Sequence, residues 1–186
     1  SDRFHKVLAD YRWYTAKEQV VLPIILRRYR LDIMHFTHFN VPILYRKPFI
    51  VTIHDLILAR YPTRRASTLG PVKYWLKHLA YKRIISSAVR RAVRVIAVSK
   101  FTKQDIIKHF NVPENNISVT YESVDPLPEP RQDSQTIFRQ YAITRPYILY
   151  VGNAYPHKNI EGLLQAYKKL VQSHPAFQLV LVGKID

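Results

Sequence analysis

The sequence has no cysteine and only four glycines, and both shortages exclude kinds of site. Without cysteine the chain can form neither a disulfide nor a thiolate metal centre, and nothing indicates an oxidising compartment. With so few glycines there is no G-x-G-x-x-G dinucleotide fingerprint. The first residues lack the apolar core of a signal peptide, and no apolar run approaches the roughly 18 residues of a membrane span. We therefore expect a globular protein in the cytoplasm.

Carboxylates are also scarce, with 13 Asp and Glu against 29 Lys and Arg, for a net charge of +16. Between Leu56 and Gln104 there is no carboxylate at all. Such a segment sets up a strong positive potential that attracts nucleic acid, anionic membranes or phosphorylated small molecules. A solvated basic face is the alternative interpretation. The basic residues expected to face an anionic membrane, on the inner side of the cell envelope, are Arg64, Arg65, Lys73, Lys77, Lys82 and Arg83.

Hydrophobic periodicity indicates the fold class. Near-continuous apolar runs, typical of buried parallel strands, alternate with longer helical patterns. This alternation predicts βαβ units in an α/β fold, a Rossmann-like doubly wound parallel sheet. The expected strands are residues 32–36, 49–53, 93–98, 117–121, 147–151 and 177–182. The expected helices are residues 16–28 with an interruption at Pro23, 71–91, 103–110, 133–141 and 160–173.

A proline-rich segment, "VDPLPEPRQ" at residues 124–132, divides the chain. Prolines at alternate positions are typical of a linker or a surface crossover. We therefore expect a partial Rossmann-like domain over residues 1–123, a linker with a connecting helix over 124–145, and the start of a second domain over 146–186. Because one βαβ unit is not a domain, we expect the chain to end inside its second domain.

Polar residues follow several of the predicted strands. His54 and Asp55 follow one strand in "VTIHDL", and Ser99 follows the next in "VIAVSKFTKQDI". Thr102 and Asp105 have the spacing of a capping box, which predicts a helix start there. Ligands of open α/β sheets bind at the carboxyl ends of strands, so we expect a site here. A histidine held only by backbone groups is the alternative for His54.

The loop in "YVGNAYPHKNIEGLL" joins a strand to an amphipathic helix. It has the spacing of a Walker loop from Gly152 to Lys158, but not the motif's second glycine or its Ser/Thr. Asn159 is a good N-cap. A lysine beside a helix N-terminus is mildly unfavourable unless an anion binds between them. On spacing alone, a solvated surface lysine is the favoured interpretation of Lys158, and an anion site is the alternative.

Taken in this order, the segments from "DIMHFTHFNVP" to the C-terminus resemble the group 1 family of retaining, nucleotide-sugar-dependent glycosyltransferases. The resemblance implies a GT-B fold of two facing Rossmann-like domains. It implies transfer of a sugar from a nucleotide diphosphate sugar to a glycan or lipid-linked acceptor in cell-surface polysaccharide synthesis, without a metal or other cofactor. His54 would be catalytic, and the substrate-binding residues would be Lys158, Gly152, Asn153, Asp55 and Ser99.

Two departures from the family pattern bear on this interpretation. Asn153 stands where family members often have a phosphate-binding arginine, so Lys158 would carry more of the diphosphate binding. The family's first strand and glycine-rich loop would precede Ser1, and its pair of donor-binding glutamates would follow Asp186. We therefore expect this chain to be an inactive fragment of a longer enzyme.

Other functions are less well supported. His35, His38, His54 and Asp55 could form a two-His, one-carboxylate metal site, but strand positions three apart point to opposite faces. Asp32 and Asp55 are not spaced as a glycosidase pair. A nucleic-acid-binding domain would explain the charge, yet no motif of RNA or DNA readers is present. A non-catalytic scaffold or membrane-binding domain remains an alternative.

Overall fold

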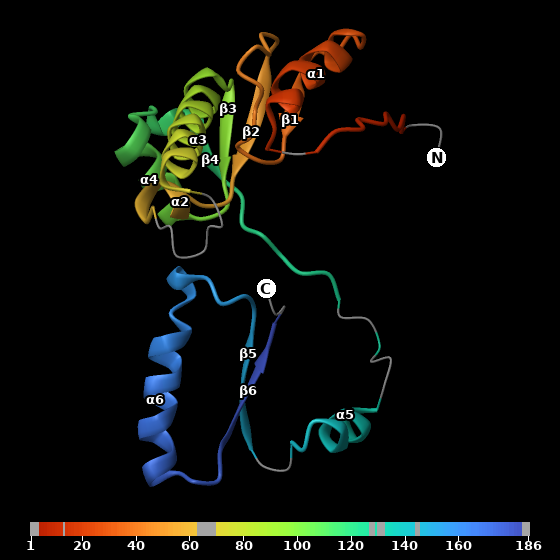
Figure 1. The fold of residues 1–186 in the computed structure, drawn as a ribbon. Coiled ribbons are helices and arrows are strands. Elements are labelled where there is room, and N and C mark those ends of the chain that lie inside the picture. Colours follow the sequence, from red (N-terminus) through yellow and green to blue (C-terminus); the bar gives the residue numbers. More distant parts are fainter. Residues whose placement is uncertain are drawn as a thin grey trace. The chain divides into compact units, whose positions relative to one another are not determined.

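The computed structural model describes residues 4–12, 14–62, 70–126, 129, 133–143 and 146–183. These residues form two compact units (Figure 1). The first comprises the described residues up to Pro62 together with Gly70–Ser123, and the second comprises those from Val124 onward. None of the described helices is long and apolar enough to cross a membrane.

The first unit is built on a parallel sheet whose strands follow one another in chain order, β1-β2-β3-β4. The register places Val51 opposite Phe36 on one side and opposite Val95 on the other. The four strands therefore point in the same direction, as the apolar runs predict. Their carboxyl ends lie together at one end of the sheet, which we call its carboxyl edge. The strands are β1 (Met34–Phe36), β2 (Phe49–Ile53), β3 (Arg94–Ala97) and β4 (Ile117–Val119).

Helices connect β2 to β3 and β3 to β4, whereas the connection from β1 to β2, which is described throughout, contains no helix. α1 (Ala16–Arg27) precedes β1; α2 (Ile57–Arg60) and α3 (Pro71–Arg91) join β2 to β3; α4 (Lys100–Phe110) and the 3₁₀ turn η1 (Glu114–Asn116) join β3 to β4. Figure 1 shows α3 and α4 beside each other against the sheet, and the two helices are in contact. The expected interruption of the first helix is wrong, because α1 continues through Pro23.

The start of α4 also differs from the prediction. The helix begins at Lys100 because the Ser99 side chain accepts a hydrogen bond from the Thr102 amide, at 3.0 Å, and so caps it. Thr102 is a buried residue of the first turn rather than the cap. The capping-box interpretation of Thr102 and Asp105 is therefore wrong.

The core lies between the sheet and its helices. Along β2, Phe49, Val51 and Ile53 are buried and alternate with half-buried neighbours, so one face of the strand is packed. Ile106 of α4 is fully buried in the same cluster. All the buried residues of α3 lie in its second half, at Ile85, Ala88 and Val89.

The second unit is a single parallel βαβ unit with one additional helix. Its elements are α5 (Ser134–Gln140), β5 (Tyr147–Val151), the 3₁₀ turn η2 (Pro156–Lys158), α6 (Ile160–Ser173) and β6 (Gln178–Val182). β5 pairs in parallel with β6. None of the residues of these elements is buried, and Tyr147, Leu149 and Val151 are exposed on alternate positions of β5.

Candidate functional site

His54 is held through both ring nitrogens at the carboxyl edge of the first sheet. Its Nδ1 lies 2.7 Å from Oε1 of Glu122, and its Nε2 lies 3.0 Å from the Thr37 carbonyl oxygen. A carboxylate and a carbonyl only accept hydrogen bonds, so both contacts together require a proton on each nitrogen. The imidazole is therefore oriented by one side-chain contact and one backbone contact. The side chains of His54 and Glu122 are 44% and 63% exposed, so a ligand can reach the pair.

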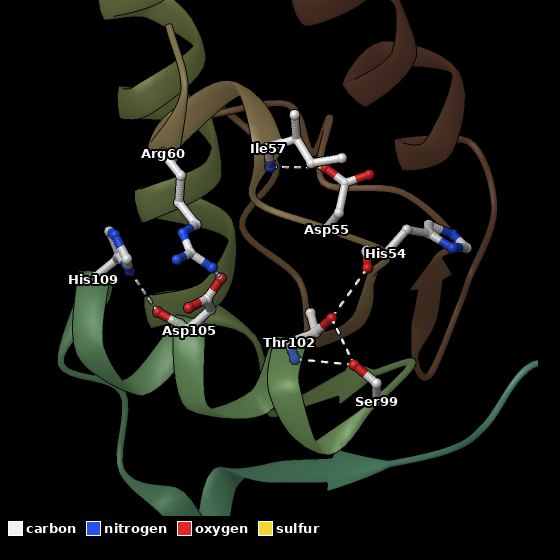
Figure 2. Close-up of polar contacts among 8 residues, drawn as sticks. All are labelled: His54, Asp55, Ile57, Arg60, Ser99, Thr102, Asp105 and His109. Atoms are coloured by element: carbon white, nitrogen blue, oxygen red, sulfur yellow. Dashed lines mark hydrogen bonds and ion pairs between the residues drawn. The ribbon is translucent and has the colours of Figure 1, made fainter. Parts of the chain in front are cut away.

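The backbone of His54 is anchored to the start of α4. The Thr102 hydroxyl donates to the His54 carbonyl at 3.2 Å, and the Ser99 hydroxyl donates to the Thr102 hydroxyl at 3.0 Å (Figure 2). Ser99 thus has two roles in this small network, as cap of α4 and as support for Thr102. Its predicted contact with substrate stays a prediction.

Asp55 and Arg60 organise the turn that follows His54. The Asp55 carboxylate accepts from the amide of Ile57, the first residue of α2, at 2.9 Å (Figure 2). Arg60 pairs with the buried carboxylate of Asp105 at 3.0 Å and lies 5.2 Å from the Phe101 ring centroid. These contacts fix the chain direction after β2, so the position of His54 is set from both sides.

His38 lies beside His54, with the two rings stacked 6.1 Å apart. Burial, followed by the neighbouring His54, lowers the pKa of His38 below its usual 6.5, although Asp55 and Glu18 act in the opposite sense. The described residues contain no group of three or more His, Cys, Asp or Glu able to hold a metal ion. His35 instead contacts the Thr52 hydroxyl across the β1–β2 pair, at 2.9 Å.

The second unit contains the other predicted residues, at the carboxyl end of β5. The Gly152 amide donates to the Val182 carbonyl at 2.9 Å, and its φ of 153° is one that side-chain-bearing residues rarely adopt. A Cβ on Gly183 would collide with the Gly152 carbonyl, so the two strand ends approach closely. The Tyr150 hydroxyl donates to the Asn153 carbonyl at 2.8 Å.

Lys158 ends the 3₁₀ turn η2 and is exposed directly before α6. Asn159 caps that helix by accepting from the Gly162 amide at 3.3 Å, which confirms it as the N-cap. The lysine therefore stands at the N-terminus of a 14-residue helix, with the geometry on which the anion-site prediction depends.

The predicted residues thus form two groups, one in each unit. His54, Asp55 and Ser99 share the carboxyl edge of the first sheet, whereas Gly152, Asn153 and Lys158 belong to the loop of the second unit. Sequence reasoning did not assign Glu122 a role, because it is 68 positions from His54. The available signal was that both residues follow predicted strands of one parallel sheet.

Comparison with known proteins identifies the family. Residues 4–126 match the family model described as Glycosyltransferase Family 4, well over half of the chain. The chain belongs to glycosyltransferase family 4. Residues 133–186 of this family 4 chain match the model described as Glycosyl transferases group 1. The family resemblance inferred from the ordered segments is therefore confirmed.

Curated relatives of the family 4 chain are named as sugar transferases. It is 25% identical over 174 residues to the O-antigen chain mannosyltransferase RfbU of Salmonella typhimurium, and 30% identical over 162 residues to the O-antigen chain mannosyltransferase B of Escherichia coli. These alignments cover 94% and 85% of the chain. The chain spans less than half the length of these relatives, 43% and 40%.

The fold has a counterpart among solved structures. Anabaena Alr3699/HepE, crystallised in complex with UDP and glucose, matches with a TM-score of 0.58 at 18% identity, over 97% of the family 4 chain and 48% of HepE. This likeness and the two parallel sheets confirm the expected parallel α/β fold of GT-B type.

Proposed function

We propose that the protein containing this chain transfers a sugar, with retention of configuration, from a nucleotide diphosphate sugar to a glycan or lipid-linked acceptor in cell-surface polysaccharide synthesis. The observation that carries the proposal is His54, held through both ring nitrogens at an open sheet edge. Two further findings support it: relatives are named O-antigen mannosyltransferases, and a protein of similar fold was solved with UDP and glucose.

His54 has the geometry of a hydrogen-bond donor to substrate. A sugar hydroxyl or a phosphate oxygen that displaces the Thr37 carbonyl would accept the hydrogen bond from Nε2–H, while Nδ1 stays in contact with Glu122. A bond from an ionised donor is stronger than one between neutral groups, and it strengthens as negative charge develops on the substrate. Glu122 acts through the imidazole, so it is a positioning residue.

Lys158 and the N-terminus of α6 would act on the leaving nucleoside diphosphate. Departure of the sugar leaves negative charge on the nucleoside diphosphate, which a lysine and a helix N-terminus stabilise without a metal ion. We therefore propose that the reaction needs no metal cofactor. Gly152 and Asn153 would bring their backbone close to the phosphates, and Asp55 and Ser99 would bind substrate beside His54.

The test uses the full-length natural protein and a panel of nucleotide sugars. A true donor raises the melting temperature, since binding to the native state stabilises it. The same donor must then support sugar transfer, and His54→Ala must abolish most of that transfer while the donor still raises the melting temperature. A protein that no nucleotide sugar stabilises, or a fully active His54→Ala variant, would contradict the proposal.

We further propose that the enzyme acts in the cytoplasm, at the inner face of a membrane, where a lipid-linked acceptor is accessible. Exposed lysines and arginines support this placement because each contributes about 1 kcal/mol of attraction near an anionic surface. Of the six basic residues expected to face the membrane, Lys73, Lys77, Lys82 and Arg83 are exposed on α3. Arg64 and Arg65 lie outside the described residues.

A further inference from the structure

The first half of α3 extends beyond the sheet that buries its second half. The helix has 21 residues, about 30 Å at 1.5 Å per residue, whereas β2 and β3 have five and four residues, roughly 15 Å. A sheet of that length can bury only half of the helix. This explains why Ile85, Ala88 and Val89 are buried while no residue before them is.

The part that extends beyond the sheet has an apolar outer face. Val72, Trp75, Leu76 and Leu79 are 71%, 54%, 64% and 63% exposed. Their spacing of i, i+3, i+4 and i+7 places them on one stripe of the helix. The usual solvent face of a helix is polar, and a continuous exposed apolar stripe indicates an interaction surface. We call these four residues the outer stripe.

The opposite side of the same turns packs inward with aromatic rings. Tyr81 meets the Phe39 ring edge to face at 4.9 Å, and burial raises the pKa of Tyr81 well above its usual value. Tyr74 and His78 are half-buried on this side and stack on each other. The orientation of the helix is therefore fixed by its inner side, and the outer stripe cannot turn inward.

Basic residues border the outer stripe. At 100° per residue, Lys73 lies on one side of it and Lys82 on the other, Arg83 continues it by one turn, and Lys77 lies farther round toward the inner side. All four are exposed, and there is no carboxylate from Leu56 to Gln104 to neutralise them. An apolar stripe between cations is typical of helices that lie in the interface of an anionic membrane.

We propose that the first half of α3 docks on an anionic bilayer, with Trp75, Leu76 and Leu79 inserted among the lipids and the bordering lysines on lipid phosphates. Tryptophan favours this interface because its ring is apolar and its N–H is polar. A second copy of the chain is a poorer occupant, since two such faces would oppose cation to cation. The inference goes beyond sugar transfer, because docking needs neither donor nor acceptor.

The experiment measures binding of the full-length natural protein to vesicles by sedimentation. Vesicles of phosphatidylcholine alone are compared with vesicles containing 30 mol% phosphatidylglycerol. We expect binding to the anionic vesicles, at least tenfold weaker for Leu76→Gln/Leu79→Gln and about fivefold weaker for each of Lys73→Gln and Lys82→Gln. The matched control is Leu164→Gln, an exposed leucine of α6, which should bind as the parent does.

Each other outcome overturns a stated part of the proposal. Equal binding to both vesicles overturns the role of charge, and unchanged binding of Leu76→Gln/Leu79→Gln overturns insertion. Loss of self-association in that variant, without vesicle binding by the parent, assigns the stripe to a second copy instead. Melting temperatures equal to the parent's show that the variants fold. If the docking proposal fails, the proposal of sugar transfer is unaffected, because the vesicle experiment involves no sugar donor.

Discussion

Lys158 is the side chain on which the proposed binding of the donor diphosphate depends most. In the full-length protein, we expect Lys158→Ala to weaken donor binding and slow transfer by about 1.5–3 kcal/mol, the contribution of a charge-assisted hydrogen bond. The measurement is kcat/KM for the donor. Lys169→Ala, an exposed lysine farther along α6, is the control. Kinetics that do not change would make Lys158 a solvated surface lysine.

The His54–Glu122 pair gives a second prediction about individual side chains. His54→Ala should reduce kcat by roughly 10²-fold or more with a smaller effect on the donor's KM, because the imidazole acts on the reacting groups. Glu122→Ala should reduce kcat about tenfold, and Glu122→Gln less, because the amide oxygen still accepts from Nδ1. Glu114→Gln, which loses an exposed ion pair with Lys103, is the matched control. Equal kcat for all Glu122 variants would show that the carboxylate does not position His54.

His38 predicts how stability depends on pH. Because burial and His54 lower its pKa in the folded protein, the unfolded chain takes up a proton first as the pH falls below about 6.5. Stability should therefore fall between pH 7.5 and 5.5, and His78, whose pKa burial and Lys82 also lower, acts in the same direction. Urea denaturation at the two pH values measures this, and His38→Gln should make the loss smaller. A loss as large in His38→Gln as in the parent would remove His38 as its source.

Among the secondary-structure elements, α4 connects stability to the site. Ser99→Ala removes the cap and should lower the free energy of unfolding by about 1 kcal/mol. If the hydroxyl also binds substrate, KM rises as well. If it serves only as a cap, KM stays unchanged in Ser99→Ala while the protein is destabilised. Denaturant unfolding and steady-state kinetics of one variant thus separate the two roles.

The elements also show how far the sequence predicts the structure. The strand over residues 49–53 is predicted with its exact limits, because a continuous apolar run has no helical alternative of that length. The start of α4 is missed because Thr102 and Asp105 imitate a capping box three residues after the true cap, Ser99, which directly follows a strand. α2 is missed because a four-residue helix has no periodicity to detect.

The site is predictable in position but not in its contacts. His54 is found because polar residues after a parallel strand gather at one edge of the sheet. Its partners come from the ends of two other strands, 17 and 68 positions away. Only the strand order and register bring the Thr37 carbonyl and the Glu122 carboxylate to one imidazole, and neither property is encoded in local spacing.

For the molecule as a whole, the exposed two-stranded sheet of the second unit leads to an expectation about residues 1–186 expressed alone. Tyr147, Leu149 and Val151 expose apolar surface on one side of β5. We expect this chain, expressed alone, to show no sugar transfer and to exchange the amide hydrogens of β5 and β6 faster than those of β2 and β3, whose core side chains are buried. Transfer at a rate near that of the full-length protein would contradict this expectation.

The strand order of the first sheet has a consequence for how the protein is made. Because β1, β2, β3 and β4 lie side by side in the order of the chain, each strand finds its neighbour already synthesised when it leaves the ribosome. The strands can therefore pair in the order in which they are synthesised, because none of the described strands that come later in the chain fills a central position of the sheet. One unpaired edge of the sheet moves outward with each new strand, while β1 remains the edge on the other side of the described sheet, so the aggregation hazard of the nascent chain lies at β1 and at the most recent strand.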